Sequence, residues 1–308
     1  MDHHTYKTPP LPEPILSRPH LPQAILDLLS RLDTRICEGV VTLDKPALLH
    51  PLSSSAVRGI LGHALKDARA TTACQLFKPG NGTPPAFLVQ PYESVSRLSH
   101  QFRFHFISWG EGRELMETTV NLEQPYFEGR PFGRGREKAV SIEFTEPDIL
   151  VFEGTNYHSL ENCANPLRLH FVTPLNLKVY DRSNPDKPRK RNLAPDALSA
   201  NHLVNGILRR LGNLCQIDGL TQLPEIKEMP LPVPTDRNLR FGGTDRSSST
   251  QTNKVRLQGI LGYMDLPSEL DPMFVELIAL ASVFHMGHHP VEGCGLIRME
   301  PLPGNYFF

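Results

Sequence analysis

The alternation of apolar and polar positions predicts a strand, helix and strand order in the first half of the chain. Apolar residues return every three or four positions over 56–69, which predicts an amphipathic helix. Every second residue is apolar over 101–107, so Phe102, Phe104 and Phe106 are expected on one face of a sheet. The elements expected in this half are a strand at 39–44, a helix at 56–69, strands at 86–90 and 101–107, a helix within 113–122 and a strand at 138–144.

The second half of the chain repeats this order. An alternating strand at 167–173 is followed by an amphipathic helix at 201–216. A strand at 255–263, a strongly apolar helix at 274–286 and a final strand at 296–299 come next. Two halves with a βαββαβ order predict an α+β protein made of two tandem ferredoxin-like, RRM-like folds.

The same pattern gives a domain organisation. A polar, asparagine-rich stretch at 153–166 is expected to be a linker. The expected parts are a proline-rich N-terminal arm with a short helix at 1–34, an N-terminal ferredoxin-like domain at 35–155, and a C-terminal ferredoxin-like domain with a glycine-rich loop at 165–308.

Composition narrows the class of protein. Of the 308 residues, 39% are hydrophobic, which is enough for a core and argues against wholesale disorder. The formal net charge of -1 excludes a uniformly basic coat protein for nucleic acid, but it leaves room for a local basic surface. No apolar run is long enough for a membrane span, and the proline-rich start is not a signal peptide. The five cysteines are far apart and form no CxxC pair, so we expect reduced thiols in a cytoplasmic protein without a zinc site.

The helix at 56–69 carries the first candidate chemistry. Gly59 and Gly62 lie three positions apart and leave one helix face open to close approach. His63 can exchange protons near neutral pH, and Arg58 and Lys66 could face a phosphate. On the residues alone, a packed helix whose histidine only forms a hydrogen bond is the open alternative.

The segment 285–295 is the second candidate. It holds three histidines, Glu292 and Cys294, but it lacks the HExxH or CxxC spacing that specifies a metal. A glycine-rich loop that follows a helix can instead hold phosphates with its backbone N–H groups. A tight turn and a metal site remain the alternatives, and we expect no metal and no cofactor. The residues expected to contact phosphate are Gly287, His288, Gly293 and Gly295.

Basic residues gather in three stretches of the second half. The stretch 236–256 carries five Lys or Arg against two Asp, a second run lies at 187–191, and the helix at 201–216 carries Arg209 and Arg210. Several such runs in a neutral protein predict a local site for a polyanion, with hydroxyls and amides as further phosphate donors. The residues expected to bind are Lys187, Arg189, Lys190, Arg191, Arg209, Arg210, Arg237, Arg240, Arg246, Ser248, Gln251, Lys254 and Arg256.

Five segments form a recognisable series along the chain. They are 57–65 (VRGILGHAL), 167–178 (LRLHFVTPLNLK), 208–214 (LRRLGNL), 245–262 (DRSSSTQ, then VRLQGILG) and 284–296 (FHMGHHPVEGCGL). Together they resemble motifs of the Cas6-type CRISPR RNA-processing endoribonucleases of the RAMP superfamily. Two positions depart from the family pattern: Ser247 replaces an aromatic residue and His288 replaces a lysine.

The resemblance implies two side-by-side RAMP domains that bind the RNA hairpin of a CRISPR repeat. It also implies metal-independent cleavage, in which the ribose 2′-OH attacks the adjacent phosphate and leaves a 2′,3′-cyclic phosphate and a 5′-OH. Such a reaction needs a base, an acid and cations. His63 is the best match for the catalytic residue, with Arg58 or Lys66 as the cation and His50 as the second choice.

Three functional hypotheses stay open at this point. The first is an endoribonuclease that matures CRISPR RNA and remains as a subunit of an effector complex with other Cas proteins, such as backbone RAMP subunits. The second is a non-catalytic RAMP subunit that binds and caps the 3′ hairpin of the guide RNA. The third is a metalloenzyme that uses the histidines and Cys294 of the segment 285–295.

Overall fold

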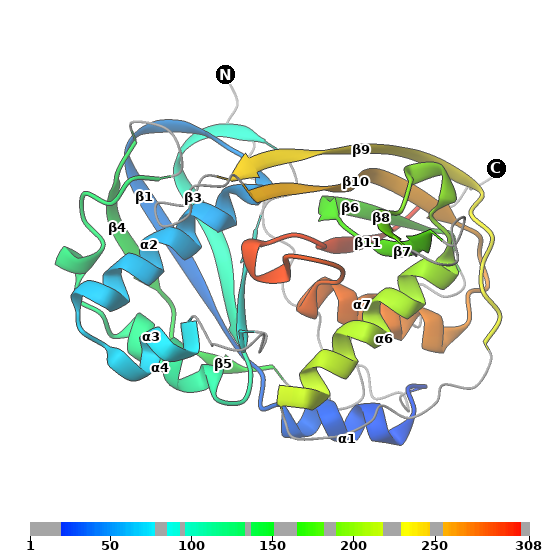
Figure 1. Cartoon of the computed structure of the whole chain (residues 1–308), viewed down its shortest axis with the longest axis horizontal. Coiled ribbons are helices and arrows are strands. Elements are labelled where there is room, and N and C mark those ends of the chain that lie inside the picture. Colours follow the sequence, from blue (N-terminus) through cyan, green and yellow to red (C-terminus); the bar gives the residue numbers. More distant parts are fainter. Residues whose placement is uncertain are drawn as a thin grey trace, which may run out of the picture.

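The first half of the chain folds into an antiparallel sheet with helices on one face (Figure 1). The computed structural model describes residues 20–77, 85–92, 96–132, 137–150, 165–181, 189–217, 229–246 and 255–302. The elements of this half, with the helix that precedes them, are α1 (Gln23–Arg31), β1 (Arg35–Leu49), α2 (Ser54–Asp67), α3 (Thr71–Phe77), β2 (Phe87–Pro91), β3 (Arg97–Ser108), α4 (Gly112–Val120), β4 (Ala139–Phe144) and β5 (Asp148–Ile149).

The second half forms a sheet of its own, together with a separate two-stranded hairpin. The hairpin pairs β7 with β8 and leaves the order of the main sheet unchanged. The elements of this half are β6 (Leu167–Leu175), β7 (Lys178–Asp181), β8 (Arg189–Asn192), α6 (Ala200–Ile217), β9 (Asp236–Arg246), β10 (Val255–Leu266), α7 (Pro272–Phe284) and β11 (Ile297–Pro301).

Both main sheets have the strand order of a ferredoxin-like fold. The first sheet runs β2-β3-β1-β4, with β5 paired to the start of β1, and the second runs β11-β6-β10-β9. Neighbouring strands are antiparallel throughout. The prediction of an α+β protein with two tandem ferredoxin-like folds is therefore confirmed. Helix α4 overlaps the window 113–122 predicted for the second helix of the first half and begins one residue before it.

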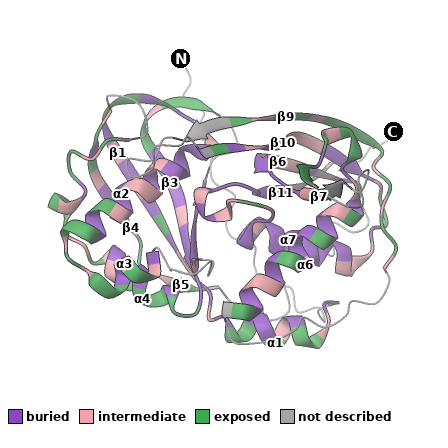
Figure 2. Cartoon of the chain, in the orientation of Figure 1, coloured by how far each residue is buried: buried purple, intermediate pink, exposed green. Residues whose placement is uncertain are grey.

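The core of the first half follows from the two periodicities seen in the sequence. Phe102, Phe104 and Phe106 are all buried on one face of β3, against the apolar face of α2 (Figure 2). A Cβ at Gly39, on the neighbouring strand β1, would overlap the ring of Phe104. A glycine at this position therefore makes room for an aromatic layer.

A second core connects the two halves. It contains most apolar side chains of α6 and α7, but it also takes in Leu88, Ile107 and Trp109 from the first half. Helix α1 belongs to the same core through Ile25, Leu28 and Leu29, although it precedes the first sheet in the sequence. Figure 1 accordingly shows α1 beside α6.

The start of α1 is fixed by a buried carboxylate. Glu276 of α7 is 1% exposed and accepts backbone hydrogen bonds from His20 and Leu21, the latter at 2.9 Å. A pair of backbone N–H groups satisfies this buried carboxylate, which would otherwise be costly. The contact joins residues that are 255 positions apart.

Helix α7 ends earlier than its apolar pattern predicts. The helix stops at Phe284, and His285 has a φ of +55°, which L residues rarely adopt. The chain therefore leaves the helix at His285 and enters the glycine-rich loop.

Several residues named in the sequence predictions lie outside the described part of the chain. The linker at 153–166 lies almost wholly outside them, as do Lys187, Ser248, Gln251 and Lys254. The four cysteines in the described part of the chain, Cys37, Cys74, Cys215 and Cys294, are free thiols. In the same part, no helix combines the length and the apolar character needed to cross a membrane.

Candidate nucleic-acid interface

The glycine-rich loop between α7 and β11 is closed by hydrogen bonds at its base. His285 Nδ1 lies 3.0 Å from the carbonyl oxygen of Cys294, and Met286 N donates to Gly295 O at 3.1 Å. Burial lowers the pKa of His285 to about 3. The ring is therefore neutral at physiological pH, and the proton on Nδ1 is donated to the Cys294 carbonyl.

The glycines of this loop face protein. A Cβ at Gly293 would overlap Ser54 Oγ at the start of α2, and one at Gly295 would overlap the carbonyl oxygen of Met286. A Cβ at Gly287 would come within 2.6 Å of Asn176 O. All three glycines have φ above +80°, which favours glycine. Gly293 and Gly295 are buried against other parts of the protein, and Gly293 approaches the neighbouring half at Ser54. A contact of these glycines with RNA stays a prediction.

The loop joins the second half to the start of α2. Arg58 Nη1 lies 3.8 Å from Glu292 Oε1, and the guanidinium of Arg58 also stands over the ring of Phe77 at 5.1 Å. Val291 belongs to the core of the first half. The loop therefore docks onto the first ferredoxin-like fold next to the residues that begin α2.

His50 lies at this junction. It precedes the short 3-10 helix Pro51–Ser53 that leads into α2, and its Nδ1 accepts the backbone N–H of Leu52 at 3.1 Å. An acceptor nitrogen carries no proton, so the neutral ring has its proton on Nε2. Burial lowers the pKa of His50, which also favours the neutral form. His50 can therefore present an Nε2–H donor to an oxygen.

His63 and Lys66 occupy the exposed face of α2. They are three positions apart and so are neighbours on the helix surface. Arg58 is five positions before His63, which turns it about 140° around the helix. Lys66 therefore lies next to His63 on the exposed face of α2, whereas Arg58 is directed to Glu292. His63 also lies nine residues beyond Ser54, or about 13 Å along the helix axis.

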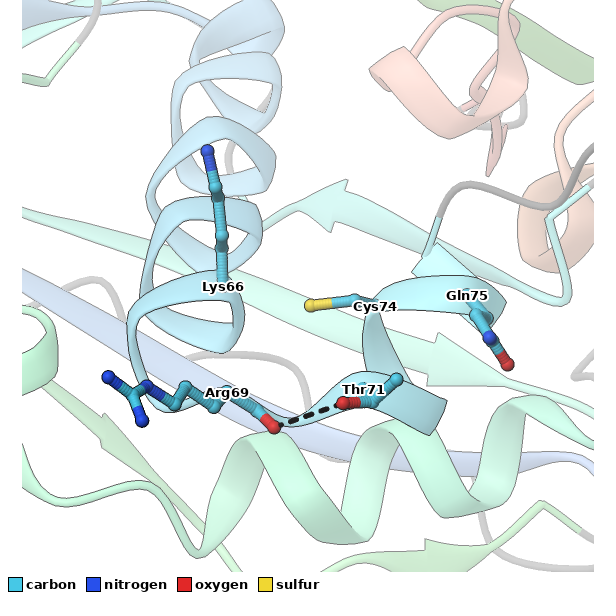
Figure 3. Close-up of a pocket in the computed structure, with 5 residues that line it drawn as sticks. All are labelled: Lys66, Arg69, Thr71, Cys74 and Gln75. Carbon is cyan, nitrogen blue, oxygen red and sulfur yellow. Dashed lines mark hydrogen bonds between the residues drawn. The ribbon is translucent and has the colours of Figure 1, made fainter.

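An open pocket lies at the C-terminal end of α2. It is lined by Lys66, Arg69, Thr71, Cys74 and Gln75 (Figure 3). Lys66 and Arg69 extend in different directions from the rim, and Thr71 Oγ1 donates to Arg69 O. The pocket continues the polar face that carries His63, and no pattern in the sequence had indicated it.

Residues from three separately predicted stretches come together around His288. Burial lowers the pKa of His288, and the charges of Lys178, His289, Arg209 and Lys190 lower it further. These five residues, here called the basic patch, come from the β7–β8 hairpin, α6 and the glycine-rich loop. Arg191 follows on β8 and is also exposed. Lys178 and His289 are not among the binding residues predicted from the sequence.

The described residues of the stretch 236–256 lie on β9 and at the start of β10, two paired strands that extend toward the first half (Figure 1). Arg240 and Arg256 are exposed, and Arg237 is exposed with Nη1 directed to Leu198 O at 3.4 Å. The strands β9 and β10 pair over eleven positions, up to Arg246. The backbones of Arg246 and Arg189 lie in strands, but their side chains are outside the described part.

Arg210 is the clearest correction among the predicted RNA-binding residues. It is 3% exposed, its Nε donates to Phe284 O at 3.0 Å, and its guanidinium stands 5.2 Å from the centre of the Trp109 ring. A side chain enclosed in this way does not reach a phosphate at the surface. The adjacent Arg209 is exposed and belongs to the basic patch.

The histidines and the cysteine of the loop do not converge on a common point. His285 and Cys294 are buried at its base, while His288 is exposed at its tip. Within the described ranges, no three His, Cys, Asp or Glu side chains are grouped in a way that could hold a metal ion. The metalloenzyme hypothesis thus has no ligand set in this part of the chain.

The chain thus has two ferredoxin-like folds in tandem, and a glycine-rich loop of the second fold docks at the start of α2 in the first. Residues 169–297 match the family model described as CRISPR-associated endoribonuclease Cas6. This match lies in the second half of the chain and agrees with the resemblance seen in the sequence.

Solved structures agree with this assignment of the fold. A Cas6 product complex is 16% identical, with a TM-score of 0.50 over 87% of this chain and 99% of that chain. A partial Cas6-RT-Cas1–Cas2 complex is 13% identical, with a TM-score of 0.51 over 88% of this chain and 47% of that chain, so the present chain spans about half of its length. No curated protein matches the chain.

Proposed function

We propose that this protein binds the hairpin of a CRISPR repeat and cleaves the precursor RNA without a metal ion. The observation that carries the proposal is the basic patch, in which Lys178, Lys190, Arg209, His288 and His289 from three segments share one surface. Clustered cations bind the RNA backbone and release its counterions. The match of residues 169–297 to the Cas6 family supports RNA as the polyanion.

Two histidines are candidates for the chemistry. His63 is exposed beside Lys66, where it could take a proton from the 2′-OH while the lysine offsets charge on the phosphate. His50 could donate a hydrogen bond from Nε2 to a phosphate oxygen, because Leu52 N–H occupies its Nδ1. The products would be a 2′,3′-cyclic phosphate and a 5′-OH.

The first experiment is a cleavage assay with repeat RNA in EDTA. We expect cleavage to persist in EDTA and to stop when the nucleotide before the cut carries a 2′-deoxyribose. Binding without cleavage would favour the non-catalytic RAMP subunit, and loss of cleavage in EDTA would favour a metalloenzyme. Slow release of the product hairpin would support the hypothesis that the protein stays on the RNA as a subunit of an effector complex with other Cas proteins.

Single variants of His63 and His50 test which of the two histidines takes part in the cleavage step. Loss of a general acid or base typically slows a reaction by about 10²–10⁴-fold, and His63→Ala is expected to fall in this range with nearly unchanged affinity. Full activity in His63→Ala together with a large loss in His50→Ala would move the role to His50. The exposed His100 on β3 provides a matched control. Arg246→Ala combined with Lys254→Ala tests the β9–β10 hairpin through affinity and its salt dependence.

A further inference from the structure

A buried cation stands where the two ferredoxin-like folds meet. Arg210 of α6 is enclosed by protein, where its guanidinium forms one hydrogen bond and faces one aromatic ring. Among the described residues, no carboxylate lies within ion-pair distance of its guanidinium. Burial lowers the pKa of Arg210 to about 10, so the side chain is still charged at neutral pH.

The two partners of Arg210 come from different halves. Phe284 O, which accepts from Nε at 3.0 Å, is the last carbonyl of α7. Trp109 directly follows β3 in the first half, and its ring also meets the Phe284 ring edge to face at 5.8 Å. Arg210, Trp109 and Phe284, here called the junction clasp, therefore touch α6, the end of α7 and the first sheet at once.

The hydrogen bond from Arg210 to Phe284 O lies at the C-terminal end of α7, where the glycine-rich loop begins. The carbonyls at a helix C-terminus have no partner within the helix and form the negative end of its dipole. Arg210 binds the last of them, and the next residue, His285, has a φ of +55° and opens the glycine-rich loop. The guanidinium thus fixes the point from which the loop departs.

Stability does not explain an arginine at this place. Burying a cation without a paired carboxylate is costly, and well-packed apolar residues of similar volume are often neutral or stabilising replacements. What an apolar side chain would lose is the directed bond to the carbonyl and the attraction to the indole face. The contribution that only an arginine makes here is therefore the geometry of these two contacts.

We infer that Arg210 is a positioning residue for RNA cleavage. Through the junction clasp it sets the glycine-rich loop, and with it the basic patch, at a fixed place relative to His63 on α2 and to His50, which precedes α2. The inference rests on the proposed function, since RNA held by one half must meet catalytic groups on the other. Small displacements of such groups are expensive, because an error of about 1 Å can slow a reaction about 10²-fold.

The test compares Arg210→Met with wild type in three measurements on the full chain. We expect equal or higher stability in urea, nearly unchanged affinity for the hairpin, and single-turnover cleavage at saturating RNA that is about 10–100-fold slower. A merely structural role would lower stability and activity together. Arg210→Lys keeps the charge and is expected to fall between Met and wild type.

Two further variants and one signal make the outcome specific. Arg209→Met removes the exposed neighbour and is expected to weaken hairpin affinity, whereas Gln216→Met on the exposed side of α6 is the neutral control. Trp109 is the only tryptophan of the sequence, so its fluorescence reports on the clasp independently of activity. Its emission should change in Arg210→Met and stay constant in Arg209→Met.

The results separate this inference from the proposed function. Wild-type cleavage together with an equal rate in Arg210→Met would overturn the positioning role alone. Proportional loss of stability and rate would overturn it as well. A wild-type protein that binds the hairpin but never cuts it would overturn the proposed cleavage, and the positioning role with it.

Discussion

The contact of Gly293 with the start of α2 gives the most closely defined stability prediction. Gly293 has a φ of +85°, and a Cβ there would overlap Ser54 Oγ. Gly293→Ala therefore combines two costs. An L residue in the left-handed region costs about 1–2 kcal/mol, and overpacking a close contact costs about 1–3 kcal/mol.

A second glycine isolates the backbone part of this cost. Gly129 has a φ of +72°, but a Cβ there would meet no atom within 4 Å. Gly129→Ala is therefore expected to lose only the strain, about 1–2 kcal/mol. The difference between the two variants in urea unfolding measures the clash between the glycine-rich loop and α2.

Removing Ser54 Oγ, the oxygen that a Cβ at residue 293 would overlap, should restore part of the lost free energy of unfolding. Ser54→Ala alone gives up a hydrogen bond to Pro51 O at 3.2 Å, worth about 1 kcal/mol. In the double variant with Gly293→Ala, the clash with the oxygen is gone, so a favourable coupling of about 1 kcal/mol or more is expected. Two results would refute the docking of the loop on α2. One is a loss of unfolding free energy in Gly293→Ala that is no larger than in Gly129→Ala, and the other is a double-mutant cycle of Gly293→Ala and Ser54→Ala without coupling.

The remaining predictions concern charge. His285 is buried in its neutral form, so it contributes stability above the pKa that histidine has in the unfolded chain. The free energy of unfolding should therefore fall by up to about 1.4 kcal/mol per pH unit as the pH drops from about 6.5 toward the folded pKa of about 3. In urea unfolding measured at several pH values, His285→Gln should remove this dependence. Arg209→Ala with Lys190→Ala should flatten the salt dependence of hairpin affinity by about two units of slope, and an unchanged slope would exclude the basic patch. Bound phosphate should raise the pKa of His288, so affinity should rise as pH falls, and NMR titration with and without RNA measures the shift. Glu276→Gln should cost about 1.5–3 kcal/mol in urea unfolding by weakening the two charged hydrogen bonds to the start of α1.

The sequence predicted those features that depend on neighbouring residues. The period of two at 101–107 and the helical period at 56–69 place the buried faces of β3 and α2 correctly, because each periodicity follows from local geometry. The order of elements then gave the tandem fold. The register, the strand β9, the hairpin of β7 and β8 and the helix α3 were not anticipated.

Arg210 shows a signal that was present and was read wrongly. It lies three positions after Ile207 and four before Leu214, both of which are fully buried. The helical period thus places Arg210 on the inner face of α6 and Arg209 outside it. The position of Arg210 in the helical period therefore indicates burial, whereas its basic character alone suggests a surface role.

The basic patch could not be predicted as one surface. Lys178, Arg209 and His288 lie on different elements, and only tertiary contacts bring them together. The same holds for the pairing of Arg58 with Glu292, which moves Arg58 away from its predicted role beside His63. Helix α1 is a third case, since its core partners lie at the other end of the chain.

The placement of α1 has a consequence for how the chain acquires its structure during synthesis. Ile25, Leu28 and Leu29 leave the ribosome early, but the residues of α7 that cover them emerge more than 240 positions later. Domains generally fold in the order of their synthesis, so the first sheet can close while the apolar face of α1 still waits for its partners. A fragment that begins at β6 would lack this helix, and a soluble second half would have to carry residues 20–32 as a separate or fused segment.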